Sequence, residues 1–478
     1  MIRTLTLDDV VEVTGGALMD GPKVAPGMSG EEVVTSVSTD TRTIQPGALF
    51  VALRGESLDG HNYLLNARTK GAAALVVDRK LTPAEAQIPH VEVVDTMMAF
   101  GDIARFVRDA FKGPVIGVTG SVGKTTVKEM IAHVLEVNYR VLKSEANFNN
   151  EIGVPQTLFQ LEETHTALVV EMGMRGPRQI LRLAEIAAPT IGVITGVGMS
   201  HVELLGSREN IAGAKSELFE MLPKDDSLGG YPATDEFAAV LKAKAKGKTL
   251  SVAIDAPADI QAIDLSRHEN GWRFTVNSPW GTTKMFVPSL GRFNVQNALF
   301  AVAVAGHLEI PLDAIARALL RWTPPAMRME TVQTDKGVTI LSDAYNAAPD
   351  SMVGALEALK DTPVGEGGKR IAVLGEMREL GAYAEEGHKI VGRAAAKYAP
   401  DMLILVGELT KKIAVGALSS GFPLDHLHQL ETTEEAVSLI PFVVQPGDVV
   451  LVKGSRAMAL EQVVTALGGG SVGTAAHP

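Results

Sequence analysis

The sequence predicts an α/β fold divided into three domains. Its 478 residues are enough for about three domains of ~150 residues each. Short apolar runs rich in β-branched residues alternate with segments of helical periodicity along much of the chain, which indicates parallel sheets covered by helices. Aromatic residues are scarce, at 5%, and Ala, Val, Leu and Gly dominate, which suits such layers. We expect the domains to span residues 1–110, 111–322 and 323–478.

Composition and charge exclude several classes of protein. The net charge of −12 and the lack of any Lys/Arg block argue against a general nucleic-acid binder. The absence of cysteine excludes disulfides, Cys-ligated zinc and thiol catalysis. No apolar run reaches about 18 residues, and the N-terminal segment lacks the apolar core of a signal peptide. We therefore expect a soluble, cytoplasmic protein without membrane insertion.

The first domain is predicted to combine helices with a small β-rich unit. Leu5 to Val13 has the pattern of a short amphipathic helix, and Thr96 to Phe111 that of a longer one. Between them, alternation from Val34, a Gln-Pro-Gly turn and the run LFVAL indicate strands. The polar clusters STDTR (38–42) and DGH (59–61) separate apolar runs. By themselves they are typical of solvated loops.

A glycine-rich turn between a strand and a helix predicts a phosphate-binding loop. It lies in PVIGVTGSVGKTTVKE (114–129), and its residues are Gly120, Ser121, Gly123, Lys124, Thr125 and Thr126. Backbone N–H groups of such a turn surround an anion, and the helix N-terminus adds its positive end. Lys124 would neutralise phosphate oxygens, and the Thr125 hydroxyl would bind Mg²⁺. The first glycine, Gly117, comes one position earlier than in the strict pattern, so a purely structural turn is the alternative.

Charged side chains of the central domain follow predicted strands. Glu171 ends the apolar run that starts at Ala167, and a carboxylate at the C-terminal end of a parallel strand faces the ligand crevice. Beside a phosphate loop it suits Mg²⁺, with helix capping as the alternative. His201 follows the run TIGVITGVG, and Lys215 lies in the helical pattern RENIAGAKSELFEML. Alone, neither predicts a function, because single His and helix Lys residues are usually satisfied or solvated.

Asparagines are concentrated in two further stretches. In EANFNNEIGVP, the residues Asn147, Asn149 and Asn150 fit a surface turn as well as a ligand contact. In LGRFNVQNALFAVAVAGHLEI, Asn294 and Asn297 lie on one face near the start of a predicted helix. They suit hydrogen bonds to a planar base, or plain N-terminal capping. Residues 223–249 are weakly patterned, and 250–287 indicate short strands.

The third domain is predicted to be a parallel, Rossmann-like sheet. After a linker at Trp322 to Pro325, the runs VTILSD, RIAVLG, MLILVG and DVVLVKG alternate with helical segments. No GxGxxG fingerprint accompanies them, so a dinucleotide is not supported. Asp343, GE (375–376) and KGSR (453–456) lie at strand ends, where they could face one crevice or form ordinary turns. The last residues, GGGSVGTAAHP, are typical of a flexible tail.

Motifs from all three domains, in order, together resemble the Mur ligases. They are GVTGSVGKTT, EANFNNEIGVP, VVEMGM, the His201…Lys215 pair, LGRFNVQNA, SDAYNAAPDSM, VLGEMRELG and VLVKGSR. The stretch DTRTIQPGALFVALRGESLDGH resembles the family's uridine-nucleotide-binding module. The resemblance covers nearly the whole chain and is greatest to the type that joins D-alanyl-D-alanine to UDP-N-acetylmuramoyl-tripeptide.

The resemblance implies a small α/β UDP-substrate-binding domain, a central P-loop ATPase domain and a C-terminal Rossmann-like domain. It implies ATP and Mg²⁺ as cofactors, and amide formation through an acyl phosphate in peptidoglycan precursor synthesis. We expect a monomer. The alternatives are another amide ligase of the Mur superfamily, or a nucleotide-dependent regulatory protein without turnover.

Carried over residue by residue, the resemblance implies particular roles. The resemblance implies that Lys124 and Thr125 bind the ATP phosphates. It implies that Mg²⁺ is bound by Thr125, Glu171, His201 and Lys215, the lysine as a carbamate. It implies that Asn294 and Asn297 contact adenine, that Arg328 contacts the γ-phosphate and that Asp343 contacts the ribose. It implies that the UDP-sugar-peptide is bound by Ser38, Asp40, Arg42 and Asn149.

The chain departs from the family's pattern at several positions. An Asn-Ala-Asp-Asp stretch is missing from the weakly patterned segment, Phe293 stands where His is common, and Ala326-Met327 replaces the Gly expected before Arg328. None of these removes a phosphate or metal group, so we expect activity.

Overall fold

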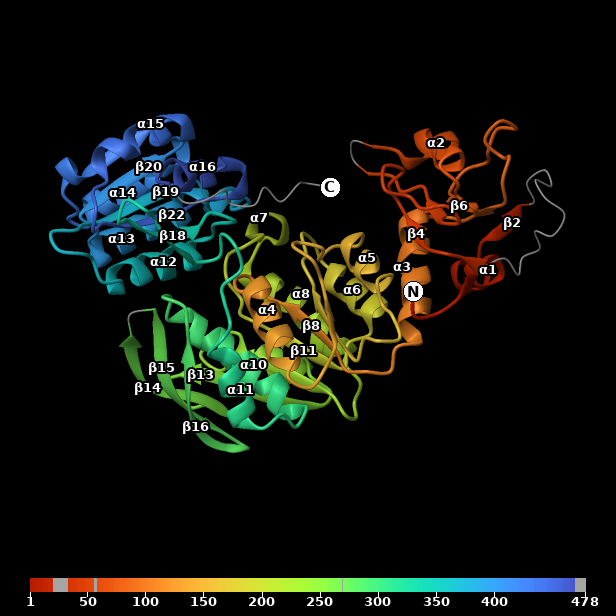
Figure 1. The fold of residues 1–478 in the computed structure, drawn as a ribbon, viewed down its shortest axis with the longest axis horizontal. Coiled ribbons are helices and arrows are strands. Elements are labelled where there is room, and N and C mark those ends of the chain that lie inside the picture. The colour runs from red at the N-terminus through yellow and green to blue at the C-terminus, as the bar shows by residue number, and fades with distance from the viewer. Residues whose placement is uncertain (20–32, 56–57, 269, 469–478) are drawn as a thin grey trace. The chain divides into compact units, whose positions relative to one another are not determined.

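The computed structural model describes residues 1–19, 33–55, 58–268 and 270–468, which form a mixed α/β architecture (Figure 1). The predicted C-terminal tail lies outside the described residues, apart from Gly468. The chain divides into two compact units. The first consists of residues 1–117, 139–173 and 179–190, and the second of residues 118–138, 174–178 and 191–478. The predicted α/β class is confirmed, and the three-domain boundaries stay a prediction.

The first unit begins with a five-stranded sheet in the order β2-β7-β6-β5-β4. Strands β4 to β7 run parallel and β2 is antiparallel to β7, while a separate pair joins β1 to β3. The strands are β1 (Leu5–Thr6), β2 (Ala17–Met19), β3 (Val33–Val34), β4 (Val37–Ser38), β5 (Leu49–Val51), β6 (Ala74–Val77) and β7 (His90–Glu92). The helices are α1 (Leu7–Thr14), α2 (Leu64–Thr69) and α3 (Thr96–Asp109).

Helix α1 begins two residues later than predicted, because Thr6 forms a capping box. The Thr6 hydroxyl accepts from the Asp9 N–H at 3.1 Å, and the Asp9 carboxylate accepts from the Thr6 N–H at 2.8 Å. These bonds satisfy N–H groups that a helix start leaves without partners.

The rest of the first unit packs beside α3. Strands β9 (Val141–Lys143) and β10 (Ala167–Glu171) pair in parallel, and α3 contacts both α5 (Gly153–Leu158) and α6 (Gln179–Ala187). The buried guanidinium of Arg108 donates to the carbonyls of Ala187 and Ala188 at 2.7 Å each. These bonds tie the end of α3 to the end of α6.

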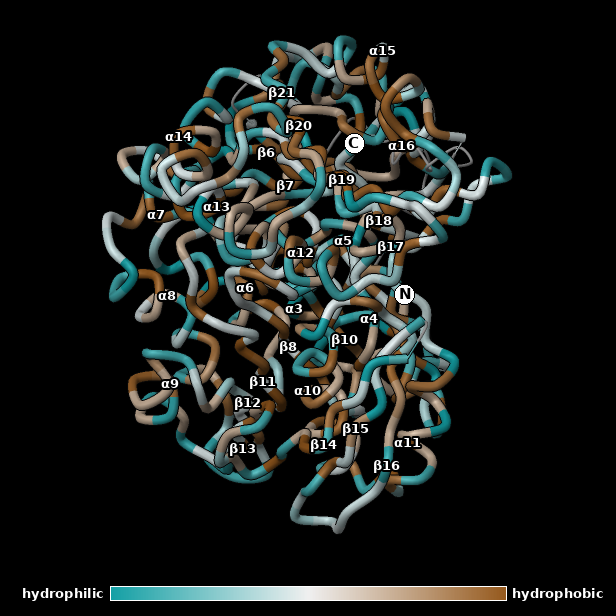
Figure 2. Tube along the Cα trace, turned by 90° about the vertical axis from the view of Figure 1, so that its left-hand side faces the viewer, coloured by the Kyte–Doolittle hydropathy of each residue, from teal (hydrophilic) through white to brown (hydrophobic). Residues whose placement is uncertain are grey.

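The second unit holds a long run of strands in the order β16-β15-β14-β13-β12-β11-β8. They are β8 (Val115–Thr119), in which the division between the units falls, β11 (Ile191–Ile194), β12 (Leu228–Pro232), β13 (Lys248–Ile254), β14 (Ile260–His268), β15 (Gly271–Ser278) and β16 (Gly281–Val287). The helices are α4 (Lys124–Leu135), α7 (Val202–Leu205), α8 (Arg208–Met221), α9 (Ala238–Lys244), α10 (Phe293–His307) and α11 (Leu312–Leu319). Figure 2 shows apolar residues concentrated along central strands such as β8 and β11.

The C-terminal part of the second unit is a six-stranded sheet in the order β17-β18-β22-β19-β20-β21. Its strands are β17 (Glu330–Gln333), β18 (Thr339–Asp343), β19 (Arg370–Gly375), β20 (Met402–Val406), β21 (Leu427–Leu430) and β22 (Val449–Lys453). All pairs are parallel except β17 with β18. The four predicted strands are present, and the edge strands β17 and β21 were not predicted.

Two apolar layers cover this sheet. Helices α12 (Pro349–Asp361), α13 (Ala384–Tyr398) and α14 (Lys411–Ser419) pack on one face, and α15 (Thr433–Val443) and α16 (Glu461–Ala466) on the other (Figure 1). Parallel sheets are buried on both faces, so their strands are continuous apolar runs, as the sequence here shows. None of the helices in the described part of the chain is long and apolar enough to span a bilayer.

Candidate functional site

The predicted phosphate loop lies between β8 and α4, and its glycines are required by geometry. Gly123 has φ +87°, and α4 begins at the next residue, Lys124. Gly120 has φ +149°, and a Cβ there would lie 1.9 Å from the Thr195 hydroxyl. Only glycine fits both positions without strain, because residues that carry a Cβ rarely adopt such positive φ values. The loop can therefore present backbone N–H groups to an anion, although a purely structural turn has the same glycines.

The segment after β11 fastens this loop. Ser121 donates its N–H to the Gly196 carbonyl at 2.9 Å, and its hydroxyl accepts from the Gly198 N–H at 2.8 Å. The Thr195 hydroxyl donates to the Val122 carbonyl at 2.5 Å. Both polar groups of Ser121 therefore hold the loop in shape, and its predicted contact with a nucleotide stays a prediction.

Three residues at the start of α4 carry the polar groups of the loop. The Lys124 ammonium donates to the Gly120 carbonyl at 2.9 Å, so its charge lies directly over the loop. The Thr125 hydroxyl accepts from Nη2 of Arg328 at 3.1 Å. Thr126 is buried at the base of the helix. The structure thus brings Arg328, 203 residues further along the chain, to the loop.

Arg328 is the middle residue of a short segment with an unusual backbone, residues 327–329, which is called the arch below. Its neighbours Met327 and Met329 have φ +57° and +54°, and both side chains are buried. This explains why the resemblance leads one to expect glycine before Arg328: the position is left-handed, which costs about 1–2 kcal/mol for a residue with a Cβ. In this chain, both thioether side chains are buried, which favours the folded state.

The arch is held by Asp343 and by a buried lysine that sequence reasoning left without a role. The Met329 N–H donates to Oδ1 of Asp343 at 3.1 Å. Lys453, 3% exposed at its side chain, donates to Oδ2 of Asp343 at 2.5 Å and to the Asn346 carbonyl at 2.9 Å. Asp343, predicted to contact ribose, therefore has both oxygens engaged within the protein.

Lys215 lies in α8 and is 1% exposed. Burial, and then the positive charge of Lys124, lower the pKa of Lys215 well below its usual value. Burial disfavours the charged form of an amine, and a nearby like charge acts in the same direction. The expectation of a solvated lysine, which the sequence alone favoured, is wrong.

His201 precedes α7 and has φ +66°. Its Nδ1 lies 2.9 Å from Oε2 of Glu379, although the ring is not aligned for a good hydrogen bond. Contact with His201 is the main reason that the pKa of Glu379 is lowered, with further contributions from Arg175 and Lys124. Glu379 belongs to the VLGEMRELG motif, and it had no predicted role.

Glu171 and Asn149 lie together in the first unit. Oε1 of Glu171 accepts from Nδ2 of Asn149 at 2.9 Å, and the Glu171 N–H donates to the Ser144 hydroxyl at 3.1 Å. Oε2 is buried and has no hydrogen-bond partner among the described residues. A buried carboxylate oxygen without a donor is costly unless a cation binds it, so this oxygen fits a metal ligand. No group of three or more His, Cys, Asp or Glu forms a metal site within the described ranges.

Asn294 and Asn297 lie at the start of α10, as predicted, but both are buried. Nδ2 of Asn297 donates to Oδ1 of Asn294 at 2.8 Å, and Nδ2 of Asn294 donates to the Ser289 hydroxyl at 2.6 Å. A Cβ on Gly123 would lie 3.0 Å from Oδ1 of Asn297. This amide pair therefore supports the phosphate loop, and its contact with adenine stays a prediction.

The predicted substrate residues of the first domain follow β4. The Ser38 hydroxyl accepts from the Asp40 N–H at 3.2 Å, and Arg42 forms bonds of 2.7–3.0 Å with both Asp40 oxygens. Arg42 thereby lowers the pKa of Asp40. The loop lies at the C-terminal edge of parallel strands, where α/β proteins bind ligands.

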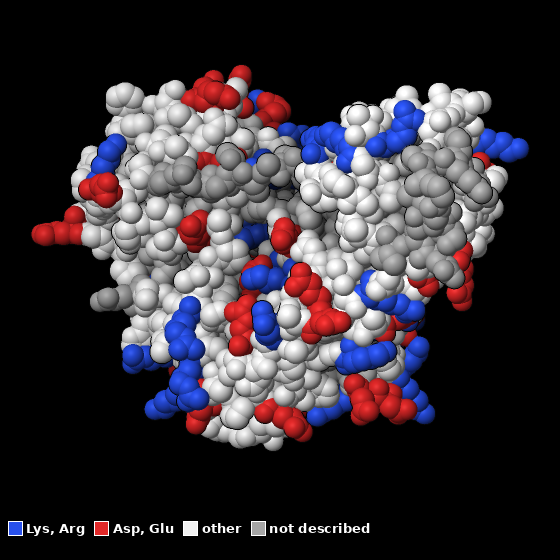
Figure 3. Space-filling model, turned by 45° about the vertical axis from the view of Figure 1, so that its right-hand side comes forward, with Lys and Arg blue, Asp and Glu red and all other residues white. Residues whose placement is uncertain are grey.

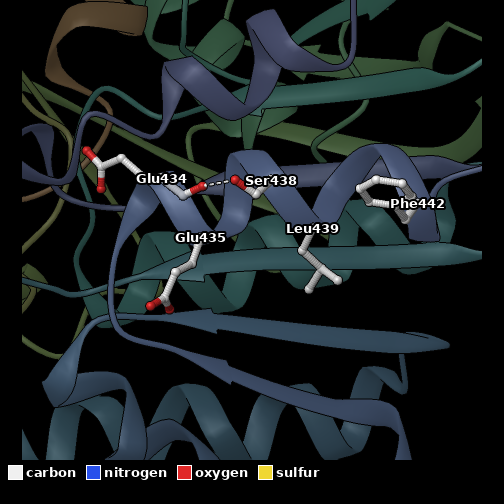
Figure 4. A pocket seen from close by; sticks show the side chains of 5 residues that line it. All are labelled: Glu434, Glu435, Ser438, Leu439 and Phe442. Carbon is white, nitrogen blue, oxygen red and sulfur yellow. Dashed lines mark hydrogen bonds between the residues drawn. The ribbon is translucent and has the colours of Figure 1, made fainter.

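A shallow hollow elsewhere contains none of the predicted site residues. It lies on α15 and is lined by Glu434, Glu435, Ser438, Leu439 and Phe442, and Figure 4 shows the two apolar side chains next to each other. Acidic and basic side chains are interspersed over the face drawn in Figure 3. The candidate site is therefore defined by the phosphate loop and not by this hollow.

Comparison with known proteins agrees with the motifs. The Mur ligase middle domain matches residues 118–305, the Mur ligase glutamate ligase domain matches 327–456, and the Mur ligase family catalytic domain matches 33–108. The UDP-N-acetylmuramoyl-tripeptide–D-alanyl-D-alanine ligase of Bacillus subtilis is 35% identical over 96% of this chain and 97% of its own. The ligase of the same name from Escherichia coli is 32% identical over 97% and 98%.

Solved structures agree in fold. MurF from Acinetobacter baumannii is 28% identical, with a TM-score of 0.88 over 98% of this chain and 99% of its own. MurF from Thermotoga maritima, solved in complex with ADP, is 25% identical, with a TM-score of 0.81 over 90% and 96%. With relatives at this identity over nearly its whole length, the chain belongs to the Mur ligase family.

Proposed function

We propose that this protein is an ATP-dependent amide ligase that joins D-alanyl-D-alanine to UDP-N-acetylmuramoyl-tripeptide in peptidoglycan precursor synthesis. The observation that carries the proposal is the 35% identity over 96% of the chain to a ligase with that name. The geometry of the phosphate loop and Arg328 supports phosphoryl transfer as the step that drives the reaction.

The reaction needs activation because a carboxylate is a poor acyl donor. A carboxylate oxygen of the tripeptide attacks the γ-phosphorus of ATP, the bond to the β–γ bridging oxygen breaks, and ADP leaves. The amine of D-alanyl-D-alanine then attacks the acyl phosphate carbon, phosphate leaves and the amine loses a proton. Positive groups that stabilise charge on the transferring phosphoryl group supply most of the catalysis in such steps.

Seven residues of the second unit are proposed to bind ATP. The backbone of Gly120 and Gly123, with the Lys124 ammonium, would cradle the β- and γ-phosphates, and Arg328 would contact the γ-phosphate. The steric requirement for glycine at position 120 and the position of Lys124 over the loop support this fit. Asn294, Asn297 and Asp343 are proposed on the nucleoside side, as the family pattern implies.

Mg²⁺ fits a set of oxygen and nitrogen donors in this chain. As the family pattern implies, its proposed ligands are Thr125, His201 and a carbamylated Lys215 in the second unit, and Glu171 in the first. The buried, unpartnered oxygen of Glu171 supports the assignment of that residue alone. When bound, Mg²⁺ neutralises phosphate charge. Lys215 suits carbamylation because burial lowers the pKa of its amine and so favours the neutral form. A neutral amine adds CO₂ and releases one proton to give an anionic carbamate.

The UDP-sugar-peptide is proposed to bind Ser38, Asp40, Arg42 and Asn149. The Ser38–Arg42 loop is already ordered by its own hydrogen bonds, which lowers the entropy cost of binding. We also propose that the enzyme acts as a monomer in the cytoplasm.

Phosphate release tests the proposal. Wild-type protein is supplied with ATP, Mg²⁺, UDP-N-acetylmuramoyl-tripeptide and D-alanyl-D-alanine, with lysine or diaminopimelate as the third peptide residue. We expect release only when both peptides are present. Release with a single amino acid in place of the dipeptide would indicate another Mur-type ligase. Nucleotide binding without release in any combination would indicate a regulatory protein.

A further inference from the structure

Arg328 is the cation that the structure brings to the phosphate loop, and its surroundings differ from those of other arginines of the second unit. Arg208, Arg292 and Arg456 each form an ion pair with a carboxylate at 2.7–2.8 Å. Within the described ranges, no carboxylate forms an ion pair with Arg328. Its guanidinium carbon instead lies 3.9 Å from the ring centroid of Tyr345.

An aromatic face holds a guanidinium without neutralising it. The ring quadrupole attracts the cation, but the ring has no net charge. A carboxylate in the same place would compete with phosphate for the N–H donors and would cancel the positive charge. Contact with the ring covers one face of the guanidinium and leaves its edge, with the N–H groups, free to donate, and Nη2 already donates to the Thr125 hydroxyl at 3.1 Å.

The chain segment that carries the ring is held on both sides of Tyr345. Tyr345 lies between Asp343 and Asn346, and buried Lys453 donates to a carboxylate oxygen of the first and to the carbonyl of the second. Asp343 also accepts from the N–H of Met329, the residue after Arg328. The same short segment therefore positions the backbone of Arg328 and the ring that contacts its side chain.

We propose that Tyr345 is a positioning residue for phosphoryl transfer, which holds the Arg328 guanidinium at the phosphate loop with its charge intact. This inference rests on the proposed function, because Arg328 acts there on the γ-phosphate. The role belongs to the aromatic face of Tyr345 and not to its hydroxyl.

The test compares variants that keep or remove the ring. Tyr345→Phe retains the face and should keep kcat within about twofold of wild type. Tyr345→Leu removes it and should lower kcat about two- to thirtyfold, the range of a cation–π contact, while KM for the UDP-peptide stays within twofold. Tyr398→Leu is the matched control. Tyr398 lies at the end of α13, and its ring centroid is 5.9 Å from the ammonium of Lys360 and 5.0 Å from that of Lys397. It should leave kcat unchanged.

Two measurements separate positioning of Arg328 from simple packing. In an Arg328→Ala background, Tyr345→Leu should lower kcat by less than a further twofold, because the contact between the ring and the guanidinium is already lost. Phenylalanine at position 345 with one, two and three ring fluorines should lower kcat stepwise, since fluorine withdraws the electron density that attracts the cation but hardly changes ring size. Equal kcat for all fluorinated variants, or additive losses in the double variant, would overturn the inference.

Wild-type phosphate release is measured first, which keeps the two proposals distinguishable. If wild type shows no dipeptide-dependent release, the proposed ligase function fails. If wild type is active and Tyr345→Leu matches it in kcat, only the role of Tyr345 fails.

Discussion

Gly120→Ala should damage both the stability of the protein and its nucleotide site. The residue has φ +149°, a region that is essentially restricted to glycine, and imposing a Cβ there costs about 1–3 kcal/mol. The new Cβ would also lie 1.9 Å from the Thr195 hydroxyl. That hydroxyl must move and lose its hydrogen bond to the Val122 carbonyl, which adds about 0.5–1.5 kcal/mol. We expect a total loss of about 1.5–4.5 kcal/mol in the free energy of unfolding.

The measurement pairs equilibrium urea unfolding with the KM for ATP in the phosphate-release assay. Because the loop backbone must shift, we expect KM for ATP to rise at least about tenfold, which corresponds to ~1.4 kcal/mol. Gly213→Ala is the matched control, since it lies inside α8 with no atom within 4 Å of the new Cβ. That change should stabilise the protein by about 0.5–1 kcal/mol. If Gly120→Ala unfolds like wild type and keeps its KM for ATP, the steric argument is refuted.

Four further outcomes are expected. Lys124→Ala should abolish turnover with little change in unfolding, because it removes a charge over the loop and no core packing; near-normal activity would contradict the phosphate-loop assignment. Arg42→Ala should raise KM for the UDP-peptide and leave KM for ATP unchanged, and an equal rise in both would count against its substrate role. Lys215 should carry a carbamate in active enzyme near neutral pH, seen as density at its tip and as a ¹³C resonance with labelled bicarbonate; a bare amine in both experiments would reject it. Glu85 has its pKa lowered from 4.5 to about 2, chiefly by its hydrogen bond to Arg79, so its ion pair stabilises the fold above pH 4.5 and is lost as pH falls toward 2. Glu85→Gln should therefore reduce the loss of stability between pH 5 and pH 2, and an unchanged acid unfolding curve would show that the pair contributes nothing.

Local sequence patterns predicted the buried strands and missed those with exposed or irregular residues. Strands β18, β19, β20 and β22 are continuous apolar runs, so periodicity reveals them. The edge strands β17 and β21 are half-exposed and lack such a run. Strand β12 is fully buried but has the sequence LGGYP, in which Gly and Pro normally indicate a break. At Gly229 a Cβ would crowd the ring of Phe219, at a distance of 3.2 Å.

For the candidate site too, local sequence patterns predicted only the parts that are continuous in the chain. The phosphate loop was predictable because its glycines and lysine are adjacent in the chain. The partners of Asn294, Asp343 and Arg328 were not, because Ser289, Lys453 and Tyr345 are chosen by tertiary packing. Asp343 and Lys453 are 110 residues apart. One signal did point to the arch: the absence of an expected glycine before Arg328 marked a position that proves to be left-handed.

The position of β22 has a consequence for biosynthesis. This strand lies between β18 and β19 in the C-terminal sheet, yet it is the last of the six to leave the ribosome. Until Val449 to Lys453 emerges, β18 and β19 have no shared neighbour, and each presents an open, apolar edge. The sheet must therefore close after nearly all of its sequence has been translated, and a nascent chain that stalls before Val449 is a natural target for chaperones and proteases.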